Sequence, residues 1–73
     1  MHTILLEFPD HLLHDSDICD AHTHSAVIDL FVHGIHASQA AHNTIILHDT
    51  KDLTVALMLL SNSSLYTAKI ASK

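Results

Sequence analysis

Histidine is the most unusual feature of this chain, which carries nine of them, and three potential metal ligands fall at helical spacing. Asp29, His33 and His36 stand at i, i+4 and i+7, so on a helix of 3.6 residues per turn the two histidines lie within about 40° of Asp29. Two imidazoles and a carboxylate within two turns can bind one Zn²⁺, Ni²⁺ or Cu²⁺. A structural site needs a fourth ligand, for which His22, His24 or a second chain are the candidates.

The alternative to a metal site is a solvated polar helix face. In a chain with nine histidines, a polar stripe contains imidazoles by composition alone. Both interpretations place these residues on the exposed side of a helix.

A second motif lies just before this stretch, in the run Asp20-Ala21-His22-Thr23-His24-Ser25. It resembles the Asp-x-His-x-His motif of the amidohydrolase and PHP phosphoesterase families, in which two histidines at the end of the first barrel strand bind a catalytic divalent metal. The resemblance implies His22 and His24 as ligands. It covers six residues of 73, whereas the barrel of those enzymes requires ~200 residues or more. A metallohydrolase-like fragment is therefore a minor alternative, and we predict that the chain is not an enzyme.

The element that must position the histidines is an amphipathic helix over about residues 25–42, which Thr23 or Ser25 can cap. Its apolar side gathers Val27, Ile28, Leu30, Phe31, Ile35 and Ala41. Gly34 and Ser38 lie on this side one turn apart, which indicates close approach of another element. We predict Phe31, Gly34, Ile35 and Ser38 as interface residues.

The remaining elements are shorter. Alternation of Ile4, Leu6 and Phe8 predicts a strand over 3–8, and the polar stretch 15–24 predicts a loop. Residues 44–48 and 65–71 are predicted strands. The apolar run 53–60 fits a buried strand, which we favour, or a short helix. The sequence thus predicts a single small α+β domain over 1–73, with one helix packed on a short, mostly antiparallel sheet. The alternative is an all-α dimer.

Composition limits the possible partners. The net charge is −5 and arginine is absent, which argues against nucleic-acid binding. No apolar stretch is long enough to span a membrane and no signal peptide is visible, so we expect a cytoplasmic protein without membrane contact. The one cysteine, Cys19, excludes an intrachain disulfide.

A core this small is often supported by a metal ion or by self-association. We therefore predict a small non-enzymatic interaction or regulatory protein that acts by protein–protein binding and forms a homo-oligomer. The alternative is a histidine-based binder of Zn, Ni or Cu.

Overall fold

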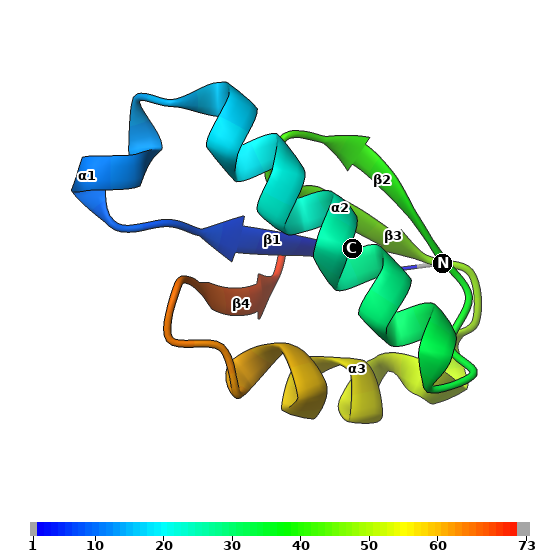
Figure 1. The fold of residues 1–73 in the computed structure, drawn as a ribbon. Helices are drawn as coiled ribbons and strands as arrows, with labels where there is room; N and C mark the ends of the chain where they lie inside the picture. The colour runs from blue at the N-terminus through cyan, green and yellow to red at the C-terminus, as the bar shows by residue number, and fades with distance from the viewer. Residues whose placement is uncertain (1, 72–73) are drawn as a thin grey trace.

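The chain folds into a four-stranded antiparallel sheet with helices packed on it, as a computed structural model describes for residues 2–71 (Figure 1). In chain order the elements are β1 (His2–Glu7), α1 (Asp10–Leu13), α2 (Ser16–Val32), β2 (Ala37–Ala41), β3 (Thr44–Leu47), the 3-10 turn η1 (Thr50–Asp52), α3 (Leu53–Ser61) and β4 (Thr67–Ile70). The predicted α+β class, a helix on an antiparallel sheet, is confirmed. The all-α alternative is wrong.

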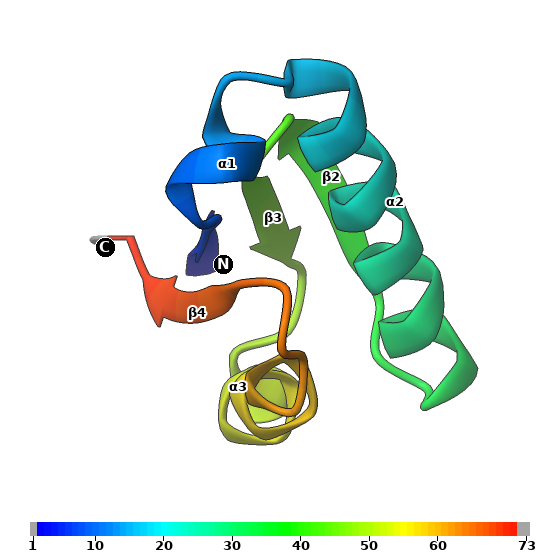
Figure 2. The same ribbon diagram turned by 60° about the vertical axis from the view of Figure 1, so that its left-hand side comes forward.

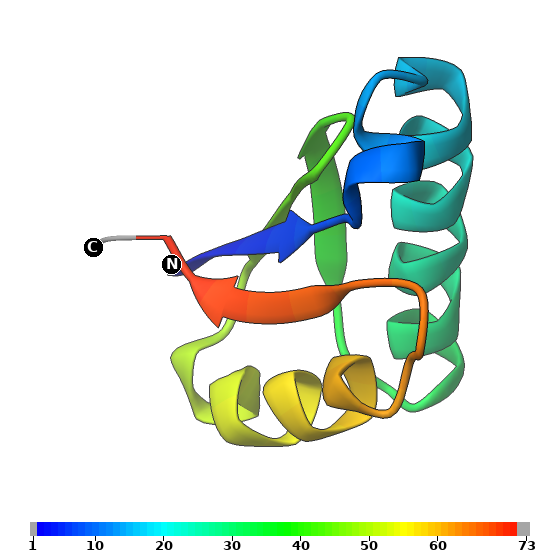
Figure 3. The same ribbon diagram turned by 90° about the vertical axis from the view of Figure 1, so that its left-hand side faces the viewer.

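The strands lie in the order β2-β3-β1-β4, and every neighbouring pair is antiparallel. The two central strands, β1 and β3, come from opposite halves of the chain, which is the split βαβ arrangement of a β-α-β-β-α-β chain. Helix α2 lies beside β2, and α3 lies beside β4 (Figures 2 and 3). Because β2 and β4 stand at the two ends of the strand order, they are the edge strands of the sheet.

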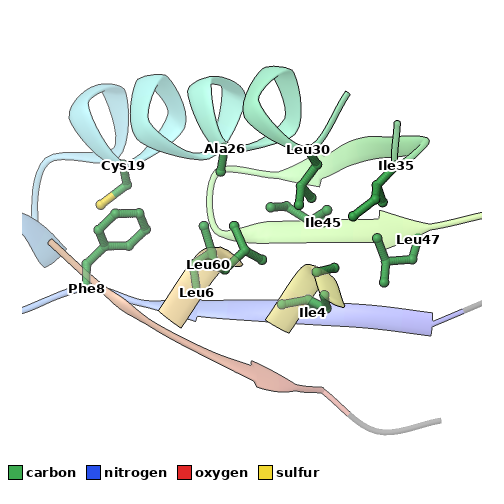
Figure 4. Close-up of a cluster of buried hydrophobic side chains, with 11 residues drawn as sticks. Ile4, Leu6, Phe8, Cys19, Ala26, Leu30, Ile35, Ile45, Leu47 and Leu60 are labelled. Atoms are coloured by element: carbon green, nitrogen blue, oxygen red, sulfur yellow. The ribbon is translucent and has the colours of Figure 1, made fainter. Parts of the chain in front are cut away.

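The core lies on one face of the sheet, because the buried residues of the central strands all point to the same side. Ile4 pairs with Ile45 across β1 and β3, and Leu6 follows two residues later on the same side. Figure 4 shows these side chains directed toward residues of both α2 and α3. The buried hydrophobic residues are Ile4, Leu6, Phe8, Cys19, Ala26, Leu30, Ile35, Ile45, Leu47, Ala56 and Leu60. The core is aliphatic apart from Phe8 and Cys19.

The bounds predicted for the long helix, 25–42, are wrong at both ends. The helix begins at Ser16, where the side chain of Asp15 accepts a 3.2 Å hydrogen bond from the N–H of Ile18. The polar residues interpreted as a loop are thus a cap and the first helical turns. At the other end the helix stops at Val32, and residues 37–41 form a strand.

Gly34 ends this helix instead of lying within it. Its φ is +83°, and its N–H donates to the carbonyl oxygen of Phe31 while the N–H of Ile35 donates to that of Leu30. This pair of bonds is the Schellman arrangement, with glycine at the position that needs a left-handed backbone. Ile35 and Leu30 are both buried, which supplies the apolar contact that accompanies the motif. No other element approaches Gly34, since a Cβ built there meets nothing within 4 Å.

The run 53–60 is helical and not the strand that we favoured. In α3 the two buried residues are Ala56 and Leu60, one turn apart, so the run packs on the sheet through a helical face. The predicted strands at 3–8, 44–48 and 65–71 correspond to β1, β3 and β4, with ends displaced by one or two residues. None of the helices within residues 2–71 is long and apolar enough to cross a membrane.

Candidate functional site

A groove runs between α2 and residues 63–66, the segment that leads from α3 to β4. Its volume is about 340 Å³. The residues that line it are His22, Ser25, Ala26, Ile28, Asp29, Val32, Ser63, Leu65 and Tyr66. We call it the α2 groove. It combines polar groups with aliphatic side chains, which is typical of small-ligand sites.

Tyr66 forms one wall of the α2 groove. Its ring packs edge-on against the buried Phe8, with centroids 5.5 Å apart, and it also lines a second hollow beside Pro9. Burial raises the pKa of the Tyr66 hydroxyl, the Ser63 side chain partly opposes this rise, and the negative charge of Asp29 adds a smaller upward effect. The phenol therefore stays protonated at neutral pH and is available as a donor.

The aliphatic part of the groove is exposed. Ile28 and Val32 lie one turn apart on α2 and are 51% and 74% exposed, and Leu65 is 42% exposed. These side chains lie away from the core stripe of α2, which runs through Cys19, Thr23, Ala26 and Leu30. Helix α2 thus carries apolar residues on both its buried and its exposed sides.

The predicted metal ligands are not brought together. No group of three or more His, Cys, Asp or Glu side chains suited to a metal occurs within residues 2–71. Because the helix ends at Val32, the shared helical face assumed for Asp29, His33 and His36 does not exist. His33 instead uses Nδ1 to donate a 2.9 Å hydrogen bond to the backbone oxygen of Asp29, and His36 packs edge-on against Phe31.

The Asp20–Ser25 motif lies on α2 and not at the end of a strand. Residues two apart on a helix point in nearly opposite directions, unlike alternate residues of a strand. His22 is accordingly half-buried in the α2 groove, whereas His24 is exposed. Metal binding by these histidines stays a prediction, without the strand geometry on which the resemblance depends.

The predicted interface residues separate into two environments. Phe31 is 63% exposed, and Gly34 and Ser38 are also at the surface. Ile35 is only 3% exposed and belongs to the core of the chain itself. A partner can reach the first three directly, but not Ile35.

A serine–histidine pair that was not predicted from the sequence lies on the hairpin of β2 and β3, which we call the edge hairpin. The hydroxyl of Ser38 in β2 lies 2.7 Å from Nε2 of His48, just beyond β3. The pairing of Ser38 with Ile46 places His48 diagonally across the ladder, but the register could not be read while 37–41 was assigned to a helix. Ser38 and His48 are both exposed, and neither lines any of the three hollows described for residues 2–71.

A second surface lies along α3. Its exposed residues are Thr54, Val55, Met58, Ser61 and Asn62, which we call the α3 face. They border an open apolar hollow of about 530 Å³. Because no charged side chain occurs between Leu53 and Ala68, nothing in this stretch gives the helix a charged outer side.

Comparisons with family models, with curated proteins and with solved structures found no match for this chain. The α2 groove, the α3 face and the edge hairpin are the candidate functional surfaces of the described residues.

Proposed function

We propose that this chain is a small non-enzymatic interaction protein that self-associates through the α3 face. The observation that carries the proposal is the composition of α3, Leu53–Ser61, which is apolar on all sides except for Thr54 and Ser61. Only Ala56 and Leu60 of this helix are fully buried in the monomer. Val55 and Met58 are 51% and 64% exposed.

A helix that is apolar all round is normally buried all round. Surface helices of soluble proteins carry charged side chains on their outer face, as α2 does with Asp17, Asp20 and Asp29. A partner surface that covers Val55 and Met58 would remove this exposed apolar area from water, at roughly 25 cal/mol per Å².

A second copy of the chain is the partner that this surface fits. Each copy has a net charge of −5, so two copies repel one another except where they meet through uncharged surface. The α3 face is such a surface, and Thr54, Met58 and Ser61 follow one another at i, i+4 and i+7. Two such stripes pack against each other about a two-fold axis, which is the commonest symmetry of homo-oligomers.

The size of the face sets the expected strength. A nine-residue helix is only about 14 Å long, and a stable interface buries about 800 Å² per partner. We therefore expect a reversible dimer of micromolar affinity and not an obligate one.

Sedimentation velocity over about 5–500 µM protein tests the proposal, since a reversible dimer changes its mean mass with concentration. Met58→Glu places a charge at the centre of the α3 face and should leave the chain monomeric over this range. Leu13→Glu is the matched control, because Leu13 is 50% exposed on α1 and lies outside the proposed interface. Circular dichroism establishes that both variants are folded. A wild type that is monomeric throughout, or equal dimerisation of Met58→Glu and wild type, would contradict the proposal.

As a second candidate function we propose divalent-metal binding at the edge hairpin. The N–H of His48 donates to the carbonyl oxygen of His36 at 3.3 Å, so the two histidines face each other where the β2–β3 ladder continues beyond its paired residues. Two imidazoles on facing strand positions can bind one Cu²⁺, Ni²⁺ or Zn²⁺ ion.

Calorimetric titration with these ions tests the hairpin site. Wild type and the control His11→Ala/His14→Ala should bind the metal, and His36→Ala/His48→Ala should not. Equal heats in all three proteins would exclude the hairpin site.

A further inference from the structure

We propose that the α2 groove binds an organic ammonium ion through its charged head and an attached apolar group. This site is separate from the α3 face and does not depend on self-association. The proposal combines three features of the groove: its charge, its aromatic wall and the aliphatic side chains on its two sides.

The charge of the groove selects a cation. Asp29 is the one carboxylate in its lining, and no lysine from the part of the chain that the structure describes lines it. His22 is the one histidine of the lining, and His33 lies nearby with Nδ1 engaged by the backbone oxygen of Asp29. That bond uses the Asp29 carbonyl, so it leaves the carboxylate oxygens free for a ligand.

The aromatic wall strengthens the same preference. The electron-rich face of a tyrosine ring attracts an ammonium group within about 6 Å of its centroid. The edge-on contact with Phe8, at an interplanar angle of 63°, holds the Tyr66 ring in place. The ring is therefore positioned before a ligand arrives, which limits the ordering entropy of binding.

The apolar residues define the rest of the ligand. Ile28, Val32 and Leu65 are exposed on the two sides of the groove and offer contact to an alkyl or aryl group. The volume of about 340 Å³ suits a molecule of a few tens of atoms at most. Phenethylammonium has this size and combines an ammonium head with an aromatic tail.

Two-dimensional NMR titration of the ¹⁵N-labelled protein at about pH 7.5 tests the proposal, with phenethylammonium chloride as ligand and 2-phenylethanol as its neutral counterpart. We expect chemical-shift changes in residues 22–32 and 63–66 with the ammonium ligand, and binding at least a few-fold weaker for the alcohol. Asp29→Asn should weaken ammonium binding by up to about fivefold, as expected for a solvent-exposed ion pair, and leave binding of the alcohol unchanged. Asp17→Asn is the matched control, since it removes one negative charge from the first turn of α2 outside the groove.

Two further variants test the role of the Tyr66 ring. Tyr66→Phe keeps the aromatic face and should retain most of the affinity, whereas Tyr66→Leu should lose it for the ammonium ligand more than for the alcohol. Three outcomes would overturn the proposal: equal affinity for the two ligands, an equal effect of Asp29→Asn and Asp17→Asn, or shift changes confined to other parts of the chain.

Discussion

The side-chain hydroxyl of Thr23 donates a 2.6 Å hydrogen bond to the backbone carbonyl oxygen of His42. Thr23 is fully buried in the middle of α2, and His42 begins the two-residue turn between β2 and β3. The next carbonyl of the turn, that of Asn43, accepts a 2.8 Å bond from the N–H of Leu6 in β1. The turn is thus tied both to the helix and to the central strand, and it fixes where the edge hairpin lies.

Replacement of Thr23 by valine should destabilise the chain by about 1–3 kcal/mol. Valine has nearly the same shape, so the loss comes from the part-buried carbonyl of His42, which no longer has the Thr23 donor. Urea denaturation followed by circular dichroism measures the effect. Ser64→Ala is the control, because Ser64 is exposed on the loop before β4 and outside the α3 face, and its change should stay within about 0.5 kcal/mol. Equal stability of Thr23→Val and wild type would show that the hydrogen bond contributes nothing net.

Gly34→Ala should cost about 1–2 kcal/mol, although a Cβ at this position meets no neighbouring atom within 4 Å. The cost arises from the backbone alone, since a φ of +83° disfavours any side chain. Gly34→Asn should cost less, because asparagine tolerates the left-handed region better than alanine. The same denaturation experiment ranks the three proteins. If alanine is at least as stable as asparagine, the Schellman geometry at the end of α2 is incorrect.

The sequence identified the strands better than the helices because alternation is a local signal. Ile4, Leu6 and Phe8 were predicted from their alternation to share one side of a strand, and all three are buried. The strand predicted over 44–48 is β3, in which Ile45 and Leu47 are buried. The bounds predicted for α2 were wrong at both ends, and each end has its own cause. The acidic cap at Asp15 looked like a loop, and alanine and glutamine in 37–41 are good helix formers that the sheet overrides.

The candidate sites were less accessible to prediction. The α2 groove joins Ile28 and Asp29 to Leu65 and Tyr66, which are more than 30 residues away in the chain, and no local pattern indicates that packing. The predicted interface depended on Phe31 being on the buried side of its helix, whereas the core stripe runs through Leu30 and leaves Phe31 exposed. Leu30 and Phe31 differ by only one position, which is 100° on a helix.

The ion pair between Glu7 and Lys69 should make the free energy of unfolding depend on pH. Lys69 Nζ lies 2.8 Å from Glu7 Oε2 across β1 and β4. This hydrogen bond and charge lower the pKa of Glu7 from its ordinary value of 4.5. A carboxylate whose pKa is lower in the folded state stabilises the fold above its unfolded pKa, and that contribution is lost as pH falls through the folded value.

Lys69→Met should therefore lower stability at about pH 7 and have little effect well below the lowered Glu7 pKa, where the wild-type carboxyl is protonated. The effect is expected to be small and to weaken in about 1 M salt, since both partners are half exposed. Urea denaturation at about pH 7, and again well below the lowered Glu7 pKa, measures the change in the free energy of unfolding. Lys51→Met serves as control, since Lys51 Nζ lies 3.7 Å from Asp49 and its side chain is 79% exposed. A Lys69→Met effect that is the same at both pH values would exclude the pair as its origin.

The thiol of Cys19 should be protected from modification until the chain unfolds. Its side chain is fully buried, and Sγ lies 3.2 Å from the carbonyl oxygen of Leu12, to which it donates. Burial raises the pKa of this thiol, and the carboxylate of Asp15 raises it further, so both effects disfavour the reactive thiolate. Reaction with Ellman's reagent at about pH 8 should be at least about 100-fold slower in the native chain than in urea.

The origin of this protection can be tested with a second site and a destabilised variant. Cys19→Ala/Ser64→Cys carries its thiol on an exposed loop and should react at nearly the unfolded rate. Gly34→Ala leaves Cys19 in place and should speed its reaction about tenfold for each 1.4 kcal/mol of lost stability, because the thiol reacts only in the opened chain. If Cys19 reacts as fast as the cysteine at position 64, or if Gly34→Ala is destabilised without reacting faster, then burial in the folded chain is not what protects the Cys19 thiol.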